Sequence, residues 1–176
     1  MEKKTVAILF GSISSEYEVS LISASSVLRN IPQDKYQVVM LGITKDGRWL
    51  EYTGPIDAIE KDLWNTPEWT CPAVLSPDRS VGGIQRFTPH GVETVKVDLV
   101  FPVLHGEHGE DGTMQGLLEL SGIPYVGCGV LASSTCMDKE VTHILLEQAG
   151  IPTAKFSVVT RGQLVRFEEL EASLVQ

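Results

Sequence analysis

The stretch Val6-Ala-Ile-Leu-Phe-Gly11-Ser-Ile-Ser-Ser-Glu16-Tyr-Glu18-Val-Ser20 decides the fold of this chain. Its first five residues form a continuous apolar run, which is typical of a strand buried on both faces. Gly11 then permits a sharp exit from the strand, because glycine has no Cβ. Apolar residues follow at helical spacing: Leu21, Ala24, Leu28 and Ile31. A buried strand that turns directly into an amphipathic helix predicts an α/β fold, in which ligands bind outside the carboxyl ends of the strands.

The start of this helix carries two carboxylates with different expected roles. Ser15 and Glu18 are three residues apart, which predicts a capping box in which each side chain bonds the other's backbone N–H. Glu16 has no such task. It either stabilises the positive end of the helix dipole or remains exposed to bind an ammonium or guanidinium group.

A second turn repeats this design with more charge. Residues Val97 to Leu104 read as a buried strand, although Pro102 indicates a frayed end or a bulge. The sequence His105-Gly-Glu-His-Gly-Glu110-Asp-Gly112 follows, and a helix is expected from Thr113 to Ser121.

The glycines of this second turn allow the backbone to pass close to a ligand. His105, at the tip of the strand, could orient a carboxylate or phosphate. The two histidines and three acids suggest a metal site, but they lack the helical H-E-x-x-H spacing. The pattern therefore favours a ligand-facing loop in which His108 is a solvated residue.

The remaining elements complete the expected architecture. Segments Ile84–Phe87 and Glu93–Val97 read as a hairpin, within a proline-rich region of irregular loops where Trp64 and Trp69 are expected to pack over the sheet edge. We therefore expect an open, mostly parallel, three-layer α/β sheet of Rossmann-like type with flanking helices and a hairpin insertion.

Beyond the second turn, the sequence predicts one further helix and strand. The helix carries Val141, Ile144, Leu145 and Gln148 and is closed by Gly150 and Pro152; the strand runs from Lys155 to Thr160.

Composition limits the function. The chain has 14 basic and 23 acidic residues and a net charge of -9, which argues against a nucleic-acid partner. No stretch is long enough to span a bilayer, and three cysteines outside any C-x-x-C pair favour a reducing, cytoplasmic location. The G-x-G-x-x-G motif is absent, which argues against a dinucleotide-binding oxidoreductase. The P-loop motif G-x-x-x-x-G-K-[ST] is absent as well.

Three motifs in order resemble those of D-alanine–D-alanine ligases. They are Phe-Gly-x-x-Ser-x-Glu-x-Glu-Val-Ser-Leu from Phe10, His-Gly-x-x-Gly-Glu-Asp-Gly-x-x-Gln-Gly from His105, and Met137-Asp-Lys139. The resemblance runs from about Val6 to Thr160 and implies an ATP-grasp ligase. Such an enzyme phosphorylates the carboxylate of a first D-alanine, and the amine of a second D-amino acid attacks the acyl phosphate to make the dipeptide for peptidoglycan.

The resemblance also implies roles for individual residues. Glu16 would bind the ammonium of the first D-alanine, and His105 would lie near its carboxylate. Val19, Ser20 and Gly106 complete the implied substrate site, with no metal ligand. Lys139 would reach the nucleotide phosphates; taken alone, it is a solvated lysine in the first turn of a helix.

Length restricts what this chain contains, because the family is about twice as long. The resemblance implies a pre-ATP-grasp, amino-terminal substrate domain over residues 1–138 and the beginning of the ATP-grasp central domain over residues 139–176. ATP and Mg²⁺ would be bound mainly by domains absent from this chain, so we expect the fragment alone to be inactive. Expected partners are D-alanine, ATP and a second copy, in a homodimer formed through the amino-terminal domain.

Two departures from the family pattern leave alternatives open. Ser12 stands where a second glycine is usual, and Tyr17 stands where histidine or arginine is common. Tyr17, together with the stretches Ile43–Trp49 and Lys96–His105, resembles the D-alanine–D-serine ligases of vancomycin resistance. If the chain truly ends at Gln176, a non-catalytic module that binds D-amino acids or a partner protein is the other alternative.

Overall fold

A computed structural model describes residues 3–160 of the chain. It divides into two compact units, one ending at Ser134 and the other starting at Thr135. The boundary expected from the sequence, between residues 138 and 139, lies close to this division and stays a prediction. No helix of the described chain combines the length and apolar character needed to cross a membrane.

The first unit is built on one seven-stranded sheet. Its strands are β1 (Lys4–Gly11), β2 (Tyr36–Ile43), β3 (Trp49–Tyr52), β4 (Thr70–Leu75), β5 (Gly83–Thr88), β6 (Gly91–Lys96) and β7 (Leu99–Pro102), in the spatial order β6-β5-β4-β3-β2-β1-β7. The strand predicted over Val97–Leu104 is therefore shorter, and it ends at Pro102, as a strand-ending proline should.

The expectation of a mostly parallel sheet is wrong. Among the strands within residues 3–160, the parallel pairs are β1–β2 and β1–β7; the β2–β3, β3–β4, β4–β5 and β5–β6 pairs are antiparallel. Short links explain part of this, because residues 44–48 can join only antiparallel neighbours, whereas a parallel pair needs a crossover. The β3–β4 link, residues 53–69, contains α2, so its length alone does not explain that antiparallel pair. The region that the sequence indicated as irregular contains β4 and contributes it to the sheet.

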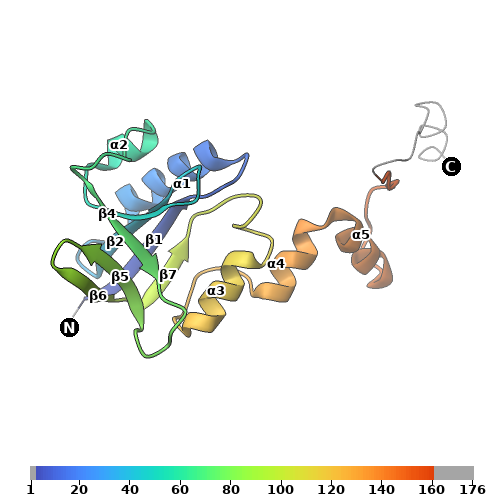
Figure 1. Cartoon of the computed structure of the whole chain (residues 1–176). Coiled ribbons are helices and arrows are strands. Elements are labelled where there is room, and N and C mark those ends of the chain that lie inside the picture. The colour runs from blue at the N-terminus through green and yellow to red at the C-terminus, as the bar shows by residue number, and fades with distance from the viewer. Residues whose placement is uncertain (1–2, 161–176) are drawn as a thin grey trace. The chain divides into compact units, whose positions relative to one another are not determined.

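Three layers are confirmed (Figure 1). Helices α1 (Tyr17–Asn30) and α2 (Ile56–Glu60) cover one face of the sheet, and α3 (Thr113–Ser121) covers the other. On β1, alternate residues divide between the two cores: Ile8 packs in the cluster with α1, and Leu9 packs in the cluster with α3. The sheet is thus buried on both faces at β1, as its apolar run predicts.

Both tryptophans are packing residues, as expected, but Trp64 lies over the interior strands β1 and β2 rather than over the sheet edge. Trp64 is fully buried, and its ring makes an edge contact with Phe10 at a centroid distance of 4.9 Å. Trp69 makes a similar edge contact with Tyr52. The predicted hairpin is also present, as β5 and β6.

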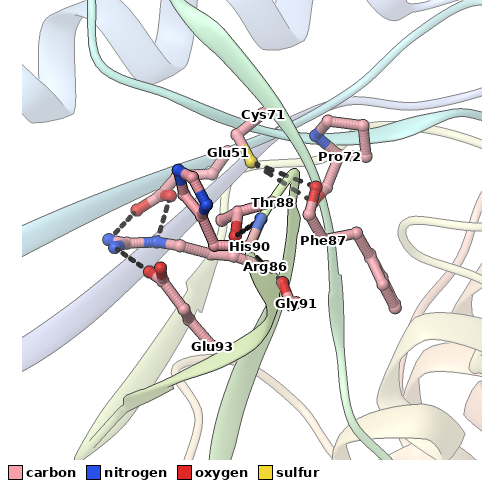
Figure 2. A network of polar contacts seen from close by, with 9 residues as sticks. All are labelled: Glu51, Cys71, Pro72, Arg86, Phe87, Thr88, His90, Gly91 and Glu93. Atoms are coloured by element: carbon pink, nitrogen blue, oxygen red, sulfur yellow. Dashed lines mark hydrogen bonds and ion pairs between the residues drawn. The ribbon is translucent and has the colours of Figure 1, made fainter.

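The antiparallel strands carry an ion pair on one face (Figure 2). Arg86 of β5 donates from Nη2 to Oε1 of Glu51 on β3 at 2.6 Å, and its Nε pairs with the other carboxylate oxygen. Glu93 of β6 lies 3.8 Å from Nη1 of the same guanidinium. Glu51 is only 5% exposed, so its buried carboxylate needs a partner, which Arg86 provides. The hydrogen bond to Glu51 is the main cause that raises the pKa of Arg86.

The second unit contains the predicted helix, α5 (Lys139–Gln148), preceded by α4 (Val130–Met137), which crosses the boundary between the units. Asp138 caps α5 by accepting the N–H of Val141 at 3.1 Å. The strand predicted over Lys155–Thr160 is wrong, because residues 151–160 form neither helix nor strand. A strand needs a neighbour to pair with, and the described part of this unit has none.

Candidate functional site

The sharp exit from β1 is present at Gly11, whose φ is +90°. A Cβ at this position would lie 2.0 Å from the carbonyl oxygen of Ile43, so only glycine fits. Ser12 continues in the left-handed region, with φ +101°, and its N–H donates to the same carbonyl at 2.9 Å. The β1–α1 loop is therefore held against the end of β2.

The predicted capping box is wrong. Helix α1 begins at Tyr17 with Glu16 as its N-cap residue, and no side chain caps it. Glu18 instead accepts a hydrogen bond from Lys45 at 2.6 Å, and this contact lowers the pKa of Glu18. Lys45 lies in the β2–β3 loop, so Glu18 pairs with a residue distant in the sequence and does not cap its own helix.

The carboxylate of Glu16 is left open. It is exposed, and within residues 3–160 it makes no hydrogen bond or ion pair. Its backbone N–H donates to Oγ of Ser14 at 3.0 Å, which orients the residue at the start of the helix. The Glu16 carboxylate therefore makes no capping hydrogen bond, and the helix dipole and a bound ammonium or guanidinium stay as its two predicted roles.

The two charged turns meet at Gly106. A Cβ on Gly106 would lie 2.9 Å from Oε1 of Glu16 and 2.7 Å from Oγ of Ser14. Gly106 has φ +69°, and its N–H donates to Oε2 of Glu110 at 2.8 Å. The structure thus brings Glu16 and Gly106 together, from segments ninety residues apart in the sequence.

His105 stands next to this contact at the end of the segment that follows β7. Its Nε2 lies 3.0 Å from Oγ of Ser23 on α1, and the pair is partly buried. Nδ1 makes no hydrogen bond within the described residues. His105 therefore has one nitrogen bonded to the protein and one available to a ligand.

Ser20 is used by the backbone. Its hydroxyl is fully buried, accepts the N–H of Gly11 at 2.8 Å and donates to the carbonyl of Val103. It thereby ties the ends of β1 and β7 to α1. Val19, one residue earlier, is 46% exposed.

The rest of the second turn is ordered by Asp111. Its carboxylate oxygens accept the N–H groups of His108 and Thr113, each at 2.9 Å. Burial acts to raise the pKa of Asp111, but these N–H groups outweigh it and hold the pKa below its usual value. The residues described contain no group of three histidine, cysteine or acidic side chains placed to hold a metal ion.

Tyr17, which the sequence marked only as a departure from the family pattern, has a structural role that was not predicted. It is buried, its hydroxyl donates to Asp62 at 2.9 Å, and it accepts the Nε1–H of Trp64 at 2.9 Å. Lys45 lies over its ring, 4.6 Å from the centroid. Burial is the main cause that raises the pKa of Tyr17 far above its usual value, so the phenol stays neutral. Nothing near Tyr17 in the sequence indicates these partners.

Lys139 belongs to the second unit, in the first turn of α5. Its ammonium is exposed and donates to the carbonyl of Cys136 at 2.5 Å. The three cysteines, Cys71, Cys128 and Cys136, are all free.

Comparison with known proteins identifies relatives of this arrangement. The family described as "D-ala D-ala ligase N-terminus" matches residues 5–128. The D-alanine–D-alanine ligase of Caldicellulosiruptor bescii is 47% identical over 163 residues, covering 93% of this chain and 44% of the relative.

Two solved structures extend this comparison. The VanG D-Ala:D-Ser ligase of Enterococcus faecalis has a TM-score of 0.81 and 48% identity, covering 88% of this chain and 44% of the other. The D-alanine–D-alanine ligase of Bacillus anthracis complexed with ATP has a TM-score of 0.60 and 27% identity, covering 96% of this chain and 44% of the other. The chain thus spans less than half the length of these relatives.

Proposed function

Since the chain belongs to the D-alanine–D-alanine ligase family, as its amino-terminal part, we propose that it supplies the first-substrate half of an ATP-dependent ligase. This ligase joins D-alanine to a second D-amino acid for peptidoglycan. The observation that carries the proposal is the open carboxylate of Glu16, which lies beside Gly106. Gly106 directly follows His105 in the chain.

These groups match the two ends of a D-alanine zwitterion. Glu16 would accept hydrogen bonds from the ammonium, and the free nitrogen of His105 would donate to the carboxylate. Val19 is exposed and can contact the methyl group, while Ser20 acts indirectly by fixing both loops. Holding both ends orients the carboxylate for phosphorylation and removes much of the entropic barrier.

The nucleotide site would be completed elsewhere in the protein. Lys139 is the candidate here, since its exposed ammonium could offset negative charge on the phosphates. The described residues offer no ligand set for Mg²⁺, so we assign the metal and most of the ATP contacts to parts of the protein outside them. We further propose that the whole protein is a cytoplasmic homodimer formed through this domain. The fragment described by this sequence should not turn over ATP by itself.

D-Alanine–D-serine ligation is the second candidate function. It is supported by the 48% identity to the VanG D-Ala:D-Ser ligase. Assaying the full-length enzyme with D-alanine and then D-serine as second substrate discriminates the two. A non-catalytic binding module would ligate neither amino acid.

Glu16→Gln in the full-length enzyme tests the site. Losing a hydrogen-bonded charge pair with the ammonium costs about 1.5–3 kcal/mol, so the KM for the first D-alanine should rise on the order of 10- to 150-fold. The free energy of unfolding should change by less than about 0.5 kcal/mol, because no described residue depends on this carboxylate.

Glu18→Gln is the matched control, because this neighbouring carboxylate pairs with Lys45. Its KM should stay near the wild-type value. An unchanged KM in Glu16→Gln, with only a loss of stability, would instead assign Glu16 to the helix dipole.

A further inference from the structure

We propose that Ser23 is a positioning residue that holds the His105 imidazole in the tautomer with its proton on Nδ1. The inference deepens the proposed function and rests on it for the role of His105. It starts from the 3.0 Å contact between Oγ of Ser23 and Nε2 of His105.

Two serines of α1 act on the same short segment. Ser20 and Ser23 are three residues apart and therefore lie on one face of the helix. Ser20 donates to the carbonyl of Val103, and Ser23 reaches the ring of His105, two residues further on. The first contact fixes the backbone that leads to the histidine, and the second fixes its side chain.

The chemistry of imidazole determines which tautomer is useful. A neutral ring carries one N–H and one acceptor nitrogen. Within the described residues only Nε2 is bonded, so a ligand would meet Nδ1. A carboxylate requires a donor there, since an unprotonated Nδ1 would present a lone pair to its negative charge. His105 can thus bind a carboxylate as a neutral ring only with the proton on Nδ1.

The hydroxyl of Ser23 can impose this state by donating to Nε2. The hydrogen bond made by one ring nitrogen sets the protonation of the other. A serine hydroxyl is also able to accept, which would favour the opposite tautomer. The direction of this one hydrogen bond therefore decides whether His105 attracts or repels the substrate carboxylate.

Long-range ¹H–¹⁵N NMR of this 176-residue protein, in mildly alkaline buffer, tests the inference directly. The wild-type His105 ring should show protonated Nδ1 and acceptor Nε2. Ser23→Ala should shift the ring towards the tautomer protonated on Nε2, and Ser23→Thr, which keeps the hydroxyl, should restore the wild-type pattern. Ser26→Ala is the matched control, since Ser26 is an exposed serine one turn further along α1. A wild-type ring protonated on Nε2, or a pattern unchanged in Ser23→Ala, would overturn the inference.

Kinetics of the full-length enzyme then separate this inference from the proposed function. Ser23→Ala should raise the KM for the first D-alanine about threefold to tenfold with little change in kcat, and Ser23→Thr should restore it. A tautomer shift without a change in KM supports the role of Ser23 but removes His105 from the substrate site. That outcome would revise the proposed function alone.

Discussion

Polar and charged groups are arranged differently around the antiparallel strands β3–β6 and around the parallel strands β1, β2 and β7. In the antiparallel half, the buried Glu51 is paired with Arg86, and Glu93 approaches the same guanidinium. In the parallel half, the carboxylate of Glu16 and Nδ1 of His105 have no partner within residues 3–160. Charges that satisfy one another stabilise a fold, whereas open groups at strand ends are available to a ligand.

Strand direction explains this division. The parallel strands β1 and β7 end at the same edge, so the loops that follow them meet there and bring Glu16 against Gly106. The antiparallel strands β3–β6 alternate in direction, and their charged residues come together across the face of the sheet. The same sheet therefore holds a structural ion pair and a candidate binding site in separate places.

Removing the cation of the antiparallel half should give the largest loss of stability. Arg86→Met leaves Glu51 buried without a partner and should lower the free energy of unfolding by about 2–3 kcal/mol, allowing for the partial exposure of Arg86. Urea denaturation of this protein measures the change. Under the proposed function, the KM of the full-length enzyme for D-alanine should stay unchanged, because Arg86 is remote from the two loops in the sheet order.

Two further variants sharpen this test. Arg29→Met breaks ion pairs with Asp57 and Glu60 that are more exposed, so its effect should be clearly smaller than that of Arg86→Met. Adding Glu51→Leu to Arg86→Met should recover most of the loss, since no buried charge then remains. If the double variant is no more stable than the single one, the ion pair does not explain the effect.

Gly106→Ala should separate stability from binding in the parallel half. The left-handed backbone costs alanine about 1 kcal/mol, and the new Cβ must displace the ends of the Glu16 and Ser14 side chains. The KM for the first D-alanine should therefore rise in the full-length enzyme.

Gly150→Ala is the control for Gly106→Ala, because the two glycines have the same backbone strain. Gly150 has φ +71°, close to the +69° of Gly106, but its Cβ would meet nothing within 4 Å. Both variants carry the same backbone strain, but only Gly106→Ala should also displace neighbouring side chains and raise the KM. Equal KM values in the two variants would show that contact with Glu16 is irrelevant to binding.

Asp111→Asn should have the smallest effect, about 0.5–1 kcal/mol, because the amide offers one acceptor oxygen where two N–H groups need acceptors. The folded-state pKa of Asp111 lies below the unfolded value of about 3.9, so its stabilisation is present above that pH. It is lost as the pH falls through the folded-state pKa. Denaturation from neutral to acidic pH should show the difference between wild type and variant shrinking; a constant difference would contradict the assignment.

The sequence predicted best what depends on neighbouring residues. The run from Val6 gave a buried strand, Leu21 and Leu28 predicted the buried face of α1, and Gly11 predicted the sharp turn between them. These features follow from periodicity and from the conformational freedom of glycine.

Features that depend on distant partners were wrong or missed. Glu18 pairs with Lys45 rather than capping its own helix, and Tyr17 binds Asp62 and Trp64. Strand direction from β3 to β6 depends on loop geometry that short strands barely encode. In the candidate site, Glu16 and His105 could be predicted because each is a polar residue that follows a predicted strand. The role of Ser23 could not be predicted, because its partner His105 is 82 residues away in the sequence.

The bonds of the Ser20 hydroxyl have a consequence for the order of folding. Its contact with Gly11 spans 9 residues, whereas its contact with Val103 spans 83. Closing the longer loop costs more entropy, so we expect β1 and α1 to associate before β7 joins them. The two loops that carry Glu16 and His105 would then come together late, and a nascent chain would assemble the candidate site only after residues beyond Val103 have left the ribosome.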